Sequence, residues 1–234
     1  MVRRHVRFRF LLRPDPGCCA GCCGLCPVCA GGPAPVRVQA TRPLLIGIDG
    51  FSGAGKTSLA LALAAELRAR RSVEVFHLED VYAGWDGLRD GMEYYRLKVL
   101  SPLAAGEPAL WQAWDWVAGC YAQTHRTEPA DIVVFEGVGA GHRAARDLLD
   151  AVVWIQAPEQ LRKERALARD GETYAPHWDR WAAQEGAWAA SDPVADAADI
   201  VVSTGTASGQ LHLYVKRALE ALPLPSAGWG RQGR

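Results

Sequence analysis

The sequence predicts an α/β domain with a parallel sheet, and three neighbouring features lead to that prediction. Residues 44–48 form a short apolar run of the kind that builds a buried parallel strand. A glycine-rich motif follows directly, and residues 58–67 after it are rich in strong helix formers. Leu59, Leu63 and Leu67 recur every fourth residue, which places them on one face of that helix.

The glycine-rich motif is a phosphate-binding loop. The residues from Gly50 to Thr57 fit the pattern G-x-x-x-x-G-K-[ST] between a strand and a helix. Its glycines let the backbone curl around phosphates, and the helix N-terminus attracts the same anion. We expect Lys56 to neutralise the β- and γ-phosphates and the Thr57 hydroxyl to ligate Mg²⁺. The sequence therefore predicts a nucleoside triphosphate site, with ATP as the default, that comprises Gly50, Ser52, Gly53, Ala54, Gly55, Lys56, Thr57 and Ser58.

Composition argues against several classes of partner. The 26 basic and 26 acidic residues balance, so no global field draws the 234-residue chain to nucleic acid or to a membrane. No apolar run approaches the length of a membrane span. We expect a cytoplasmic protein whose partner is a small molecule, and the sequence leaves its oligomeric state open.

The first 42 residues differ from the rest of the chain. Six of the seven cysteines crowd between Cys18 and Cys29, among arginine, glycine and proline. We interpret 1–42 as a disordered leader or as sequence upstream of a later start, although the Cys-x-x-Cys spacings also permit a zinc site. The catalytic domain is predicted over 43–222, with a disordered tail over 223–234.

Two further apolar strands end in acids. Residues 73–78 lead into Glu79 and Asp80, and residues 131–136 end at Glu136. Ligands bind at the carboxyl edge of open parallel sheets, so these acids are candidates for the site. Glu136 is predicted to hold Mg²⁺ directly or through water. Two more strands are predicted over 151–155 and 199–202.

Other segments are assigned more coarsely. We expect a loop over 83–91, then a helix through Tyr94, Leu97 and Leu100 that ends at Ser101 and Pro102. The tryptophans of 111–116 suit packing in the core or a lid, or stacking on a planar substrate. Helices are also expected over 176–190, with Trp178, Trp181 and Trp188 on an apolar face, and over 210–221.

The segment 158–171 is predicted to form a basic helix. Arg162, Arg165 and Arg169 recur at helical spacing on one face. Such a stripe could be merely solvated, but beside a triphosphate it can close over the phosphates and stabilise the charge of the transferred group.

Taken in order, these motifs resemble the uridine kinase/phosphoribulokinase branch of the P-loop kinases over about residues 44–170. Uridine kinases have a similar Asp-x-Phe-Tyr after the second strand, a Tyr-Asp-Phe, a Phe-Glu-Gly-Ile and an arginine-rich lid that ends in Arg-Asp. The corresponding segments here are His77–Tyr82, Trp114-Asp115-Trp116, Phe135–Val138 and the run to Arg169-Asp170.

The resemblance implies a three-layer P-loop fold, with a five-stranded parallel sheet in the order 2-3-1-4-5 and an arginine-rich lid. It also implies transfer of the γ-phosphoryl group of ATP to a hydroxyl, with a nucleoside as the leading acceptor. Asp80 would be the general base, with Glu79 as its competitor. The remaining roles fall to the substrate residues Tyr82 and Asp115, the Mg²⁺ ligand Glu136, and the lid arginines Arg165 and Arg169.

The sequence departs from the family where the acceptor binds. Uridine kinases follow Tyr-Asp-Phe with a histidine, whereas residues 117–121 here contain none. The acceptor could therefore be a nucleoside monophosphate, a sugar or a pantothenate-like alcohol. A regulatory nucleotide-binding protein without an acceptor is the alternative from another class, although a pure switch has no need of an acid at position 80.

Overall fold

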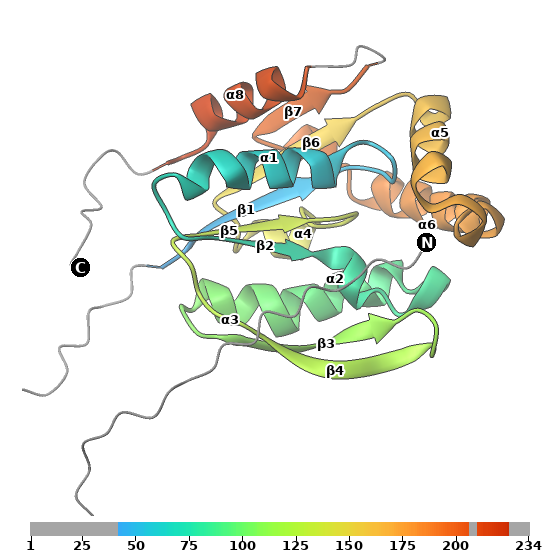
Figure 1. Cartoon of the computed structure of the whole chain (residues 1–234), viewed down its shortest axis with the longest axis horizontal. Helices are drawn as coiled ribbons and strands as arrows, with labels where there is room; N and C mark the ends of the chain where they lie inside the picture. The colour runs from blue at the N-terminus through green and yellow to red at the C-terminus, as the bar shows by residue number, and fades with distance from the viewer. Residues whose placement is uncertain (1–41, 206–209, 225–234) are drawn as a thin grey trace, which may run out of the picture. The chain divides into compact units, whose positions relative to one another are not determined.

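The computed structural model describes residues 42–205 and 210–224 (Figure 1). Its strands are β1 (Leu44–Asp49), β2 (Val73–His77), β3 (Ala109–Asp115), β4 (Cys120–Thr127), β5 (Ile132–Glu136), β6 (Ala151–Gln156) and β7 (Ile200–Ser203). Its α-helices are α1 (Lys56–Arg68), α2 (Leu88–Tyr95), α3 (Ser101–Ala104), α4 (Arg143–Arg146), α5 (Glu159–Asp170), α6 (Trp178–Ser191), α7 (Val194–Ala197) and α8 (Leu211–Ala221).

Five strands form one parallel sheet in the order β2-β5-β1-β6-β7. Counted along the chain within this sheet alone, that is the predicted 2-3-1-4-5 order; the labels differ because β3 and β4 belong to a separate hairpin. The first strand lies at the centre, between β5 and β6. Because β1 leads into the phosphate-binding loop, this position puts the loop at the middle of the sheet's carboxyl edge.

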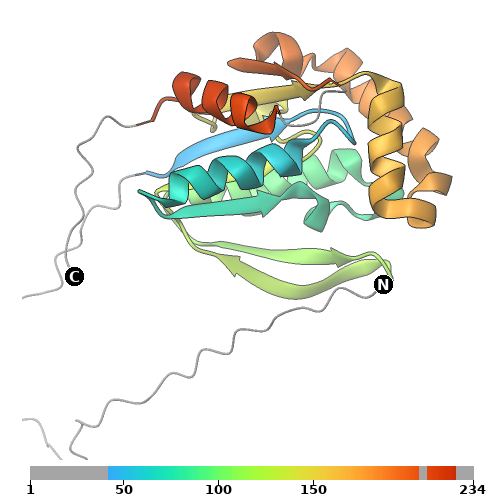
Figure 2. The ribbon, with the colours of Figure 1, turned by 45° about the horizontal axis from the view of Figure 1, so that its top comes forward.

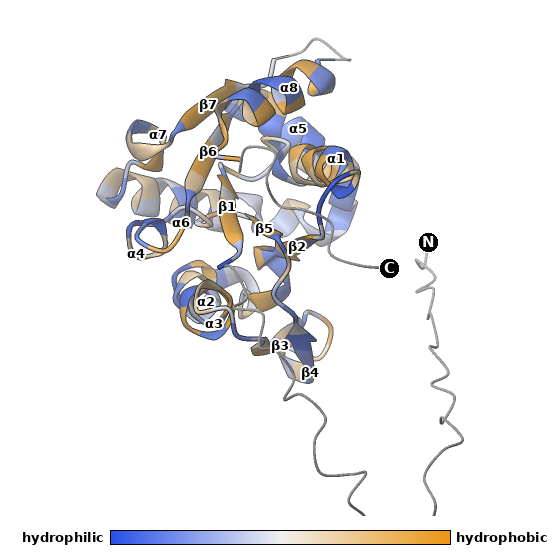
Figure 3. Ribbon diagram, turned by 90° about the vertical axis from the view of Figure 1, so that its left-hand side faces the viewer, coloured by the Kyte–Doolittle hydropathy of each residue, from blue (hydrophilic) through white to orange (hydrophobic). Residues whose placement is uncertain are grey.

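The sheet lies between two layers of helices. Ile46 and Ile48 of β1 face α1 and α8, while Leu45, the neighbour of Ile46 in β1, faces the cluster that contains α2 and α3. Figures 1 and 2 show α1 and α8 on one side of the sheet and α2, α3 and the hairpin on the other. Apolar residues concentrate on the central strands and on the sides of the helices that face them (Figure 3). The three-layer architecture is as predicted.

Two local predictions are wrong. The segment expected to be a loop over 83–91 is partly helical, because α2 begins at Leu88 and buries Leu88 and Met92. The helix expected to end at Ser101 and Pro102 continues through a π-helical turn, Arg96–Leu100, into α3. Pro102 stands in the first turn of α3, where a missing N–H does little harm.

The β3–β4 hairpin was not predicted as strands. Trp111 anchors it: the ring is buried beside Phe76, and the indole N–H donates to Thr127 Oγ1 at 2.9 Å. Core packing of tryptophan, one of the two predicted roles of 111–116, therefore holds for Trp111.

The predicted leader 1–42 lies almost entirely outside the described residues, as does most of the predicted tail. Pro223 and Leu224 are described, and Leu224 packs against the cluster formed by α1 and α8. Across residues 42–205 and 210–224, no helix combines the length and the apolar character that crossing a membrane requires.

Candidate active site

A cavity of about 340 Å³ opens at the carboxyl edge of the sheet. Four separate parts of the chain line it: the phosphate-binding loop, the segment after β2, the segment after β5, and the region from the end of α5 into α6, with Trp116 of the hairpin added. The lining residues are Ser52, Gly53, Lys56, Thr57, Glu79, Tyr82, Trp85, Trp116, Glu136, Gly137, Val138, Arg169, Asp170, Thr173, Tyr174 and Trp181.

The phosphate-binding loop has the geometry of an anion site. Gly55 is the N-cap of α1 and has φ 105°, a left-handed conformation that favours glycine. It offers no side chain to the free N–H groups of the helix, and the position of a Cβ on Gly55 has no atom within 4 Å. Lys56 Nζ lies 3.1 Å from the carbonyl oxygen of Phe51, inside the curl of the loop. Free backbone N–H groups at the start of a helix favour an anion such as phosphate. Of the eight predicted loop positions, four line the cavity, namely Ser52, Gly53, Lys56 and Thr57. The other four, Gly50, Ala54, Gly55 and Ser58, do not.

The two predicted Mg²⁺ ligands meet in the structure. The Thr57 hydroxyl donates to Glu136 Oε1 at 3.0 Å, and both residues line the cavity. Glu136 is buried, and the same oxygen lies 2.6 Å from Nδ1 of His77. This contact with Glu136 raises the pKa of His77. A hydroxyl and a carboxylate beside a phosphate loop form a donor set of hard oxygens, which suits Mg²⁺.

The two neighbouring acids after β2 have different surroundings. Both side chains are exposed, but Glu79 lines the cavity, whereas Asp80, which the sequence suggested as the base, does not. Partial burial raises the pKa of Glu79, and Arg169 opposes that rise. Burial also raises the pKa of Asp80, against the effect of His77. The motif could have indicated Glu79 rather than Asp80. Asp-x-Phe-Tyr places its acid three residues before the tyrosine, and Glu79 stands three residues before Tyr82.

The three arginines of α5 have three different environments. Arg169, for which a lid role is predicted, lines the cavity next to Asp170. Arg165, predicted to act with it, turns to the segment after β7, where it donates to Thr204 Oγ1 and to the carbonyl of Gly205. Arg162 is buried against the phosphate-binding loop.

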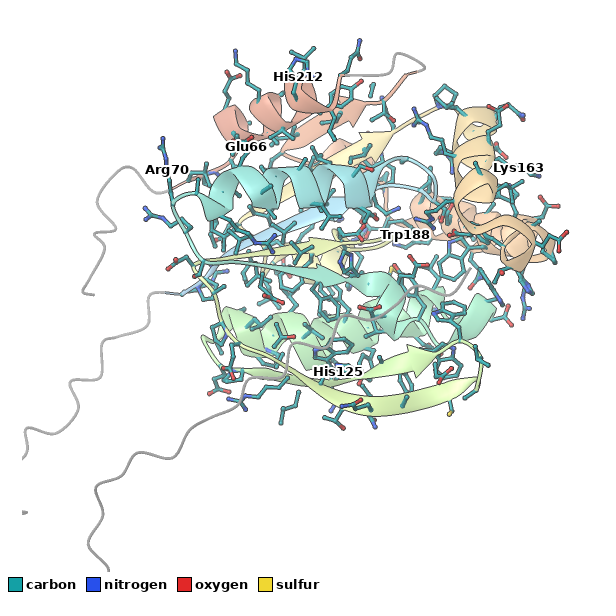
Figure 4. All side chains as sticks on the ribbon, viewed as in Figure 1. Glu66, Arg70, His125, Lys163, Trp188 and His212 are labelled. Atoms are coloured by element: carbon teal, nitrogen blue, oxygen red, sulfur yellow. The ribbon has the colours of Figure 1, made fainter. Side chains whose placement is uncertain are left out.

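Aromatic rings form one wall of the cavity. Trp85 is the centre: its ring lies 4.8 Å from that of Trp116, stacks on Tyr174 at 5.2 Å, and stands edge-on to Trp181 at 6.3 Å. We call Trp85, Trp116, Tyr174 and Trp181 the aromatic wall. Trp188 lies further along α6 (labelled in Figure 4) and does not line the cavity. Its ring centre lies 6.5 Å from that of Trp154.

The two predicted substrate residues are placed differently. Tyr82 lines the cavity but is buried, and its hydroxyl donates to the carbonyl of Val138 at 2.8 Å. Asp115 is not a lining residue; its carboxylate accepts the N–H groups of Val117 and Ala118 and closes the hairpin turn. Hydrogen bonds to these two N–H groups lower the pKa of Asp115.

Asp49, the last residue of β1, is a site-building residue that the sequence analysis missed. It is fully buried and accepts three backbone N–H groups, from Gly50 at 2.6 Å, Gly139 at 2.9 Å and Gly141 at 2.8 Å. It thereby ties the start of the phosphate-binding loop to the segment after β5. Asp49 could have been identified by the pattern that pointed to Glu136, an acid at the end of an apolar strand.

Asp49 also gives a pH-dependent prediction. Burial raises its pKa to about 6, against the lowering effect of its N–H donors. Folding therefore favours the protonated form of Asp49. The contribution of that form to the free energy of unfolding is complete below the unfolded pKa near 4 and is lost as the pH rises through 6. Relative to Asp49→Asn, wild-type stability should fall with pH in this window, by at most about 1.4 kcal/mol per pH unit. Urea unfolding at several pH values measures the slope, and a flat difference would contradict the assignment.

Comparisons with known proteins agree with the motifs. No model of a protein family matches the sequence. A uridine kinase from Lactobacillus johnsonii is 28% identical over 148 residues, which are 57% of this chain and 70% of that protein. A uridine kinase from Streptococcus gordonii is 25% identical over 145 residues, 56% of this chain and 69% of that protein.

Solved structures confirm the fold. The structure of a possible uridine kinase from Bacillus stearothermophilus aligns with a TM-score of 0.51 and 22% identity, over 70% of this chain and 91% of that one. The ordered motifs, the sequence relatives and the sheet order agree with one another. The chain is therefore similar in sequence to uridine kinases and has the fold of a possible uridine kinase.

Proposed function

We propose that the protein transfers the γ-phosphoryl group of ATP to a hydroxyl of a nucleoside-like small molecule. The observation that carries this proposal is the single cavity in which the phosphate-binding loop, the carboxylate of Glu79 and the aromatic wall all take part. A planar ring system can stack on such a wall, which would bring an attached hydroxyl toward the loop. We expect the protein to act in the cytoplasm.

The residues at the loop fit a triphosphate and its metal. When bound, ATP supplies the phosphoryl group and Mg²⁺ neutralises charge on its phosphates. Lys56 and Arg169 are the cations that line the cavity, and they would stabilise the charge that builds up on the transferred group. Thr57 and Glu136 would hold the metal, directly or through water, because their oxygens already lie 3.0 Å apart.

Glu79 is the carboxylate that we propose as the general base. It would accept the proton of the acceptor hydroxyl as that oxygen bonds to the γ-phosphorus and the bond to the β-phosphate oxygen breaks. A base works best when its pKa approaches the working pH, and partial burial shifts the pKa of Glu79 in that direction. This replaces Asp80, whose side chain does not line the cavity.

Other acceptors remain within the proposal as alternatives. A sugar or a pantothenate-like alcohol could also lie against tryptophan, and a nucleoside monophosphate would require a cation for its phosphate. A regulatory protein would bind ATP without an acceptor, and Glu79 in the cavity beside the loop argues against that reading.

Transfer of labelled phosphate from ATP should be assayed across nucleosides, nucleotides, sugars and small alcohols. Transfer to none of them would refute the kinase assignment to these classes.

The aromatic wall gives the sharpest test of the acceptor class. Trp85→Ala removes its central ring and should raise the KM for a nucleoside about 5- to 100-fold, because stacking on an aromatic ring contributes about 1–3 kcal/mol per base. The Kd for ATP should stay within twofold. Trp188→Ala is the matched control, since it removes a tryptophan from outside the cavity. An unchanged acceptor KM in Trp85→Ala would contradict stacking on the wall.

A further inference from the structure

Glu185 is a buried carboxylate behind the phosphate-binding loop. It belongs to α6 and is 2% exposed. One of its oxygens, Oε1, accepts the backbone N–H of Ser52 at 2.8 Å and the indole N–H of Trp181 at 3.0 Å. Ser52 is part of the loop and Trp181 is part of the aromatic wall. A single oxygen atom therefore joins the two sides of the cavity.

Arg162 completes the arrangement from α5. It is 8% exposed, and it donates from Nη1 to the carbonyl of Ser52 at 3.1 Å and from Nε to the carbonyl of Ala157 at 3.2 Å. Its guanidinium lies 4.9 Å from the ring centre of Phe51 and 3.8 Å from Oε2 of Glu185. The backbone N–H and C=O of Ser52 are thus held by the two members of one buried ion pair.

The packing at Gly53 shows how closely α5 approaches the loop. A Cβ at this position would lie 2.1 Å from the carbonyl oxygen of Arg162, and Gly53 has φ 76°. Only glycine fits here without a backbone shift. All three residues of the first half of the loop, Phe51–Gly53, therefore contact α5 or α6.

The position of the pair separates it from the reacting groups. Neither Arg162 nor Glu185 lines the cavity, so neither is placed to touch a bound phosphate. Burying two charges carries a desolvation cost that their mutual attraction seldom exceeds, so stability alone is a weak reason for such a pair. The contacts of the pair with Ser52 instead support a role in holding the phosphate-binding loop in one position.

We propose that Arg162 and Glu185 are positioning residues that fix Phe51–Gly53 of the phosphate-binding loop relative to the aromatic wall. The inference deepens the proposed function and rests on it for the identity of the ligand, MgATP. Loss of Glu185 frees Ser52 and Trp181 from their shared acceptor and leaves Arg162 without its partner. The loop then has to be ordered when ATP binds, and that ordering weakens affinity.

The test compares Glu185→Ala, Glu185→Gln and Asp192→Ala by calorimetric titration with MgATP and by thermal unfolding. Glu185→Ala should raise the Kd for MgATP at least tenfold. Glu185→Gln keeps an oxygen for Ser52 and Trp181, so its Kd should stay within about threefold of wild type although its charge is lost. Asp192→Ala breaks a second ion pair, which joins the residue just after α6 to Arg146 at 2.7 Å; neither of these residues lines the cavity. It should lower the unfolding midpoint without changing the Kd.

The outcomes are distinct. An unchanged Kd in Glu185→Ala would show that the pair only stabilises the fold, and a lower Kd would show that the carboxylate competes with phosphate; each overturns the proposal. Parallel changes of Kd in Glu185→Ala and Asp192→Ala would also overturn it, because the effect would then follow stability. Failure of wild type to bind MgATP would instead refute the proposed function. Titration needs no acceptor, so a wrong acceptor class leaves this test intact.

Discussion

Replacing Lys56 with alanine is expected to abolish turnover and weaken ATP binding while leaving the fold almost unchanged. Lys56 lies within the curl of the phosphate-binding loop and lines the cavity. Among the described residues, Lys56 and Arg169 are the two basic side chains that line the cavity, so the charge of a transferred phosphoryl group would lose a principal source of stabilisation. Removing one such group typically lowers kcat about 10²- to 10³-fold or more. The rate of phosphate transfer and the Kd for ATP measure the loss.

The unfolding midpoint separates this effect from damage to the fold. In the described structure, the ammonium group of Lys56 donates one hydrogen bond, to the Phe51 carbonyl, so Lys56→Ala should unfold near the wild-type temperature when no ligand is present. Lys98→Ala is the control, because Lys98 is an exposed lysine of the π-helical turn after α2 and does not line the cavity. It should leave both rate and affinity unchanged. Wild-type turnover in Lys56→Ala would refute the role of the loop.

The sequence was most informative where local pattern determines structure. Apolar strands that end in glycine or in an acid predicted the parallel sheet and the edge at which the cavity opens. The contact between Thr57 and Glu136 followed from the same reasoning, because the carboxyl ends of parallel strands meet at one edge. These predictions depend on residues close together in sequence or on the alignment of neighbouring strands.

The remaining features depend on packing between distant segments. Arg165 and Arg169 look alike in the sequence, and only the positions of β7 and α6 decide that Arg169 reaches the cavity. The buried partner of Ser52 is Glu185, 133 residues away. Nothing in the local sequence around Glu185 distinguishes it from an ordinary surface acid of a helix. The arginine-rich helix was therefore predicted, but the different environments of its three arginines were not.

Glu79→Gln is expected to lower kcat about 10²- to 10⁴-fold, the range that a general base contributes. Glutamine keeps the size of the side chain but cannot take the proton of the acceptor hydroxyl, so ATP affinity should change by no more than a few-fold. The pH profile gives a second readout. A base must be ionised, and the raised pKa of Glu79 moves the acid limb of kcat/KM above the range of an ordinary glutamate. That limb should disappear from the profile of the variant.

Asp80→Asn is the matched comparison, because Asp80 is the adjacent acid and is exposed like Glu79, but does not line the cavity. It should retain kcat within a few-fold, along with the acid limb. Greater damage from Asp80→Asn than from Glu79→Gln would assign the base to Asp80, as the first interpretation of the motif did. If both variants transfer phosphate at the wild-type rate, neither acid is the base, and catalysis would then rest on positioning and charge neutralisation by Lys56, Arg169 and the metal ligands.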